Sequence, residues 1–140
     1  MALDGLRVLI VEDEPLLGME LEATVVSAGH AVVGWATNRA NALALGDARS
    51  PDIAFVDFRL LDGDTGLELS QRLSERGVAV VLTTANATDH VGKLDHALGI
   101  VSKPYSAETI HTVLRDAAEK LDSGGTAPNS VPEPQVKSNE

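Results

Sequence analysis

The feature of the sequence that most restricts its fold is a regular alternation between short apolar runs and longer amphipathic segments. Five runs rich in Val, Ile, Leu and Ala lie at residues 7–11, 31–36, 53–56, 78–82 and 100–102. Short, almost wholly apolar strands are typical of a parallel sheet that helices cover on both faces. The pattern therefore predicts repeated β-α units with right-handed crossovers.

The segments between these runs have the periodicity of helices, and we expect helices at about 15–27, 39–48, 66–75, 88–98 and 107–121. Asn38 and Ser106 are good N-cap residues, and Gly29 stands where a C-cap glycine belongs. The pattern at 88–98 is weakened by Gly92, and because only 18 residues separate Thr84 from Lys103, that helix should be short or irregular. The predicted fold class is α/β, a doubly wound five-stranded parallel sheet with five helices.

Composition indicates one folded domain followed by a polar tail. Of the 140 residues, 44% are hydrophobic and only 3% are aromatic, so the core should be aliphatic. Gly, Ser and Pro are frequent from residue 122 onward, and we predict a domain at 1–121 and a disordered tail at 122–140. Neither an export signal nor a membrane span is recognisable, and a cytoplasmic location is expected.

The net charge and the absence of cysteine limit the kinds of partner and of metal site that the chain can have. A formal net charge of −10 disfavours direct binding to nucleic acid or to an anionic membrane. The same charge suits a divalent cation or a basic partner. The sequence contains no cysteine, which excludes a disulfide framework and a thiolate metal site.

Side chains that can bind a metal ion or take part in a reaction lie at the carboxyl ends of four predicted strands. These strand ends share one edge of a doubly wound sheet. Clustered carboxylates repel unless a cation joins them, and oxygen-only ligands favour Mg²⁺, with Mn²⁺ as a substitute. A carboxylate beside Mg²⁺ can attack phosphorus, while a lysine and a hydroxyl bind the phosphoryl oxygens. The side chains are Glu12, Asp13 and Glu14 after the first strand, Asp57 after the third, Thr84 after the fourth and Lys103 after the fifth.

Each of these signals has an ordinary structural explanation when it is taken alone. An acidic run is often a solvated turn, Asp57 and Thr84 could cap a helix or turn, and Lys-Pro is a common loop dipeptide. Their order, with each at the end of a different strand, favours a shared site.

Over about residues 5–121 the chain resembles the receiver domains of bacterial response regulators. The matching segments read VLIVEDE at 8–14, IAFVD at 53–57, VLTTA at 81–85 and VSKP at 101–104. The resemblance implies a flavodoxin-like, CheY-like sheet with strand order 2-1-3-4-5, and the subgroup that it suggests is the single-domain receiver of the stand-alone alphaproteobacterial kind.

The resemblance also implies a role for each matching residue. Asp57 corresponds to the phosphoacceptor, Thr84 to the switch hydroxyl and Lys103 to the lysine that pairs with the phosphoryl group, while Ala85 is small where phosphate must enter. The implied Mg²⁺ ligands are Asp13 and Asp57 directly, Glu12 through water, and the backbone carbonyl of Arg59.

Three positions depart from the family pattern. Glu12 stands where an aspartate is usual, and Ile100 replaces the aromatic residue of many receivers, so a signal would have to pass through Thr84 and the repacking of 88–102. Arg59 either lies over the acceptor and alters the lifetime of the phosphoryl group, or only screens the acidic cluster.

The function expected is that of a phosphorylation-dependent switch that receives its phosphoryl group from a histidine kinase or a histidine phosphotransfer protein. It would be no enzyme beyond its own phosphorylation and dephosphorylation. The segment 88–121 is the expected output face, and either this face or the predicted helices at 15–27 and 107–121 would form a homodimer interface. The alternatives are a phosphorylation-independent pseudo-receiver, an aspartyl-phosphate phosphatase and a flavodoxin-like cofactor binder. Arg59, where a phosphatase needs Asp, and the lack of a phosphate-binding loop after the first strand argue against the last two.

Overall fold

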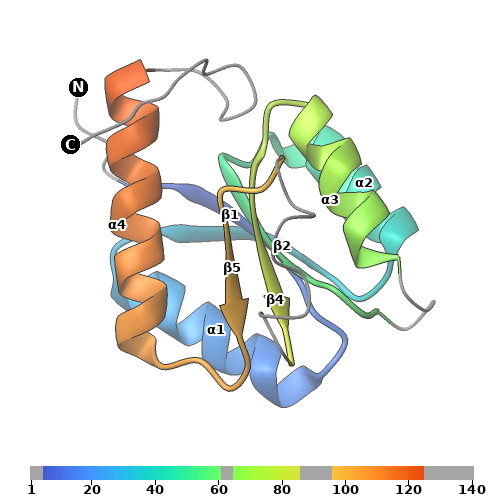
Figure 1. The fold of residues 1–140 in the computed structure, drawn as a ribbon, viewed down its shortest axis with the longest axis horizontal. Coiled ribbons are helices and arrows are strands. Elements are labelled where there is room, and N and C mark those ends of the chain that lie inside the picture. Colours follow the sequence, from blue (N-terminus) through green and yellow to red (C-terminus); the bar gives the residue numbers. More distant parts are fainter. Residues whose placement is uncertain (1–4, 61–64, 86–95, 125–140) are drawn as a thin grey trace.

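The computed structural model describes residues 5–60, 65–85 and 96–124. They form a five-stranded parallel sheet with the strand order β2-β1-β3-β4-β5, which confirms the predicted fold class (Figure 1). The third and fourth strands run one and two residues beyond their predicted ends, so the candidate site residues at both positions belong to the sheet. The strands are β1 (Arg7–Val11), β2 (Ala31–Ala36), β3 (Ile53–Asp57), β4 (Ala79–Thr84) and β5 (Gly99–Ser102).

Four helices lie within the described residues: α1 (Pro15–Ser27), α2 (Arg39–Arg49), α3 (Gly66–Glu75) and α4 (Ala107–Gly124). Their starts agree with the predicted ones, and the caps explain why. The Asn38 side chain accepts a hydrogen bond from the Asn41 amide at 2.9 Å, and the Ser106 hydroxyl accepts one from the Thr109 amide at 3.1 Å.

Two predicted helix ends are wrong. Residues 96–98 are not helical, because the Leu98 amide donates to the Val80 carbonyl at 2.7 Å and so begins the approach to β5. Most of the segment predicted as a helix at 88–98 lies outside the described residues. The last helix continues to Gly124 instead of ending at 121, since Asp122 and Ser123 are tolerated in a helix and the first strong helix breaker is glycine.

The sheet separates two aliphatic cores, with α1 and α4 on one face and α2 and α3 on the other (Figure 1). Strand β1 supplies both, since Val8 and Ile10 belong to the first core and Leu9 and Val11 to the second. Burial on both faces is the reason that this strand reads as an unbroken apolar run.

Trp35 joins the end of β2 to helix α1 and to the residue that follows β1. Its indole N–H donates to the backbone carbonyl of Glu12 at 2.9 Å. Helix α1 approaches the ring closely at Gly18, where an added Cβ would lie 1.9 Å from Cζ2 of Trp35. No sequence pattern reveals this contact, and the structure shows that the pair fixes how α1 lies beside the end of β1.

Replacing Gly18 by Ala should therefore lower the free energy of unfolding. Alanine is favoured over glycine in a helix by about 1 kcal/mol, but the clash with the indole should outweigh this gain and leave a net loss of roughly 1–3 kcal/mol. Urea denaturation measures the change. Gly99→Ala is the control, because its added Cβ meets no atom within 4 Å. A Gly18→Ala protein as stable as the wild type would contradict the packing described here.

Candidate phosphoryl and metal site

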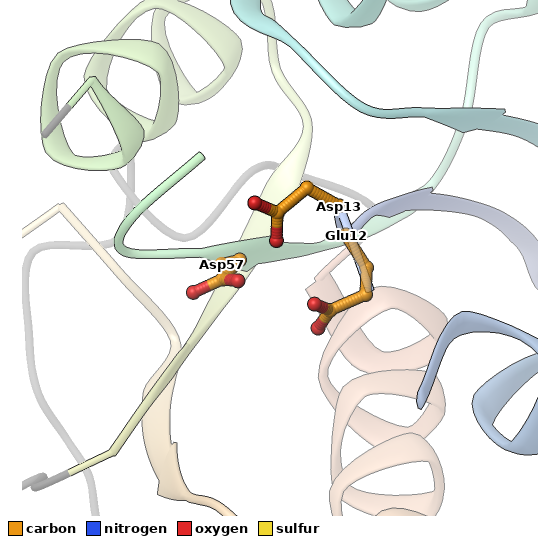
Figure 2. Close-up of side chains that lie close together, drawn as sticks. All are labelled: Glu12, Asp13 and Asp57. Atoms are coloured by element: carbon orange, nitrogen blue, oxygen red, sulfur yellow. The ribbon is translucent and has the colours of Figure 1, made fainter. Parts of the chain in front are cut away.

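Three carboxylates from two neighbouring strand ends lie together at the carboxyl edge of the sheet. Glu12 and Asp13 directly follow β1, and Asp57 is the last residue of β3. One oxygen from each of the three lies within 4.8 Å of the others (Figure 2). Glu12 and Asp57 are only 2% and 5% exposed, so their charges are poorly hydrated. The structure thus brings together the three acids that the sequence analysis selected.

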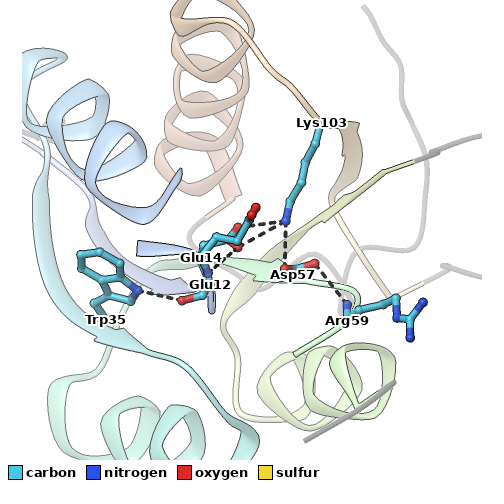
Figure 3. Close-up of polar contacts among 6 residues, drawn as sticks. All are labelled: Glu12, Glu14, Trp35, Asp57, Arg59 and Lys103. Carbon is cyan, nitrogen blue, oxygen red and sulfur yellow. Dashed lines mark hydrogen bonds and ion pairs between the residues drawn. The ribbon is translucent and has the colours of Figure 1, made fainter. Parts of the chain in front are cut away.

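Lys103 follows β5, which lies on the other side of β3 from β1, and its side chain reaches the acidic cluster. Its Nζ lies 2.9 Å from Oδ2 of Asp57 and 3.1 Å from Oε1 of Glu12 (Figure 3). The Lys103 backbone is held in place as well, since its amide donates to the Thr84 carbonyl at 2.7 Å. One ammonium therefore bridges two buried carboxylates that come from different strands.

The pKa of Glu12 reflects first the burial of its carboxyl and then the excess of negative charge in the cluster. Burial, followed by the nearby charge of Asp57, raises the pKa of the Glu12 carboxyl to about 7, although hydrogen bonds from Glu14 and Lys103 act in the other direction. Burial acts to lower the pKa of Lys103, but its hydrogen bonds and charge interactions with Asp57 and Glu12 outweigh this and raise it. An additional cation at this place would relieve the remaining repulsion.

The loop after β3 presents the Asp57 carboxylate. The Arg59 amide donates to Oδ1 of Asp57 at 3.1 Å, and the Phe58 amide donates to the Thr83 carbonyl at 2.8 Å. The Arg59 side chain extends away from that carboxylate (Figure 3). The backbone of Arg59 therefore lies close to the Asp57 carboxylate, as it would have to if the Arg59 carbonyl were a metal ligand.

Gly66, the first residue of α3, is a site residue that sequence reasoning missed. An added Cβ would lie 2.1 Å from the backbone oxygen of Asp57 and 2.5 Å from that of Phe58. Its amide donates to the Phe58 carbonyl at 3.1 Å. The sequence does contain a signal that could have revealed it, because this glycine stands at the predicted start of a helix and only nine residues after Asp57.

Thr84 and Ala85 complete the strand edge. Thr84 ends β4, is buried, and pairs in register with Ser102 of β5. Its neighbour Thr83 pairs with Asp57. Ala85 follows and is exposed. All predicted site residues therefore lie at one edge of the sheet.

This arrangement suits a hard divalent cation. The donors are oxygen atoms only, two of the three acids are buried, and the net charge of the cluster is negative, which is the set that Mg²⁺ prefers. A carboxylate that also touches an ammonium can act as a nucleophile towards a phosphoryl group whose charge the ammonium offsets.

None of the described helices is long and apolar enough to cross a membrane.

Comparison with known proteins agrees with this fold and this edge. The family model described as the response regulator receiver domain matches residues 8–115. The phyllosphere-induced regulator PhyR of Methylorubrum extorquens is 32% identical over 114 residues, which are 79% of this chain and 43% of that protein. Protein PilH of Pseudomonas aeruginosa is 31% identical over 111 residues, which are 74% of this chain and 90% of that protein.

Two solved structures that contain receiver domains superpose on this chain. The solution structure of the receiver domain of PhyR from Erythrobacter litoralis superposes with a TM-score of 0.77 at 27% identity, covering 98% of this chain and 100% of that one. A variant of the anti-anti-sigma factor PhyR from Bartonella quintana superposes with a TM-score of 0.79 at 26% identity, covering 86% of this chain and 51% of that one.

The chain spans about half the length of the first curated relatives that it matches, 43% of one and 58% of the next. It therefore corresponds to one domain of those longer proteins. The match of the family model to most of the folded part, together with the strand order 2-1-3-4-5, shows that this chain belongs to the family of response regulator receiver domains of two-component systems.

Proposed function

We propose that this chain is a phosphorylation-dependent switch whose acceptor is Asp57 and whose donor is a histidine kinase or a histidine phosphotransfer protein of the cytoplasm. The observation that carries the proposal is the position of the Asp57 carboxylate. It is almost fully buried at the strand edge, beside two further acids and 2.9 Å from the Lys103 ammonium. Burying a carboxylate charge costs free energy unless a cation or hydrogen bonds compensate it. Buried charges of this kind are therefore common at functional sites.

In the proposed reaction an oxygen of the Asp57 carboxylate attacks the phosphorus of a phosphohistidine. A carboxyl oxygen–phosphorus bond forms, the phosphorus–nitrogen bond to the imidazole breaks, and the imidazole leaves and takes up a proton. Lys103 already contacts the acceptor and would offset the negative charge of the phosphoryl oxygens. Hydrolysis of the acyl phosphate returns the carboxylate, and the chain turns over no separate substrate.

The group that this site would bind is Mg²⁺, with Mn²⁺ as a substitute. The residues that would hold it belong to the acidic cluster, with the backbone carbonyl of Arg59 as a further ligand. When bound, the ion supplies positive charge beside the carboxylate and the transferred phosphoryl group.

Output would be a change in protein–protein contacts. Thr84 is the last residue of β4 and pairs with Ser102 of β5, and a bond from its hydroxyl to the phosphoryl group would favour one arrangement of this edge of the sheet over another. The partner would then distinguish the two states at β5 and α4, which also form a candidate homodimer face.

Asp57→Asn should abolish phosphorylation while leaving the fold intact. With acetyl phosphate and Mg²⁺, the intact mass of the wild type should increase by one phosphoryl group, and Trp35 fluorescence should change. Neither change should occur in Asp57→Asn, whereas Asp116→Asn, an exposed acid of α4, should behave as the wild type. If the wild type gained no phosphoryl group from any donor, cognate kinases included, the chain would be a phosphorylation-independent pseudo-receiver.

Mg²⁺ should stabilise the protein, because it would bind the native state and not the unfolded chain. At about ten times its dissociation constant, the ion should raise the thermal midpoint by roughly 5 °C. Differential scanning fluorimetry with Mg²⁺ or with a chelator measures the shift. Asp13→Asn should lose it and Asp116→Asn should keep it. An equal shift in Asp13→Asn would exclude that residue as a ligand.

A further inference from the structure

Strand β2 is an outer strand of the sheet, and its own sequence gives it no charge. It stands first in the order β2-β1-β3-β4-β5, so within the described residues it pairs with a strand on one side only. No Asp, Glu, Lys or Arg occurs between Glu22 and Arg39, a stretch that contains the whole strand AVVGWA. An uncharged outer strand rich in valine and aromatic residues is a template for pairing with a strand of another molecule.

The other outer strand, β5, is protected by its own sequence. It has only four residues, whereas β2 has six. Lys103 and Pro104 also follow it within two residues, and a short length, a lysine and a proline all disfavour the addition of a further strand. Since β2 has none of these features, its protection has to come from elsewhere in the fold.

A bulge interrupts β2 near its middle. Val8 of β1 pairs with Val32, but the next residue of β1 pairs with Gly34. Val33 therefore has no counterpart in β1. It is half-buried, and the described residues of the two cores do not include it. A bulge makes an outer strand a poorer template, because it bends the strand and disturbs the regular spacing of its hydrogen-bonding groups.

Arg49 brings a positive charge to this bulge from another element. It is the exposed last residue of α2, and its Nη1 donates to the Val33 carbonyl at 3.2 Å. The backbone beneath it is held by Arg7, whose guanidinium donates to the Arg49 carbonyl and, at 3.2 Å, to the Ser50 carbonyl. The bulge residue of β2 thus has its carbonyl in use and a guanidinium beside it.

The partner that fits an unprotected β2 is a second copy of this chain. Two identical outer strands can pair antiparallel about a two-fold axis, and the uncharged residues 31–36 would offer each other no repulsion. In a pair centred at the bulge, the two Arg49 guanidinium groups would come close together and repel each other. An incoming amide would also find the Val33 carbonyl already bonded.

We propose that Arg49 prevents strand β2 from pairing with β2 of a second copy of this chain. The contact lies apart from the carboxyl edge of the sheet and from the homodimer face proposed at β5 and α4, so the inference does not depend on the proposed function. Because the Arg49 side chain is exposed, its bond to Val33 competes with water and should contribute little to the stability of the monomer.

The test replaces Arg49 by Met, which keeps much of the length of the side chain but has neither charge nor donor. The full chain is studied unphosphorylated and in a chelator. Sedimentation equilibrium gives the association constant, and hydrogen–deuterium exchange of residues 31–36 at low and high protein concentration locates the contact. Arg76→Met is the matched control, because it removes one exposed positive charge whose ion pair with Asp47 joins α3 to α2.

Arg49→Met should associate at least about tenfold more tightly than the wild type. Residues 31–36 of this variant should exchange more slowly at high protein concentration than at low. Arg76→Met should equal the wild type in both measurements. Association of Arg49→Met no tighter than that of the wild type, or equally tight association of Arg76→Met, would overturn the proposal.

A second substitution separates protection of the strand from support of the fold. Val33→Lys in the Arg49→Met background returns a positive charge to the bulge, so it should restore the association constant of the wild type. The urea midpoint of Arg49→Met should stay close to that of the wild type. A clearly lower midpoint, or association that Val33→Lys does not reverse, would show that Arg49 supports the fold instead and would refute the inference.

Discussion

The interaction on which this site depends is the bridge that the Lys103 ammonium makes between the buried carboxylates of Asp57 and Glu12. Without a cation, two acids at 5% and 2% exposure would repel each other and favour protonation of one of them. The bridge also ties the ends of β1, β3 and β5 together across the edge of the sheet. The fold determines the site here, because the polar residues meet only if the three strands end at the same level of the sheet.

Close backbone packing supports this bridge from both sides. Gly66 lets α3 begin against the carbonyl of Asp57, and Gly18 lets α1 lie against the ring of Trp35, which in turn binds the carbonyl of Glu12. Both glycines serve by having no side chain, and not by adopting an unusual backbone conformation. The acid that follows β1 and the acid that ends β3 are therefore each held by a helix that approaches unusually closely.

The sequence predicted the fold class, the strand order and the edge at which the polar residues meet, because parallel topology alone places strand ends together. It also predicted the capping roles of Asn38 and Ser106, which depend on neighbours three residues away. It could not predict the contacts that depend on three-dimensional register. The Trp35 bond to Glu12, the helix contact at Gly66 and the bond from the Leu98 amide to the Val80 carbonyl all join different segments of the fold.

In the proposed reaction Asp57, and no other residue, becomes the acyl phosphate. Borohydride reduces an aspartyl phosphate to homoserine, so peptide mass spectrometry after phosphorylation and reduction identifies the acceptor directly. Homoserine is expected at position 57 alone, and only when both Mg²⁺ and the phosphoryl donor are present. Homoserine at position 13, or at any other aspartate while position 57 remained unmodified, would contradict it.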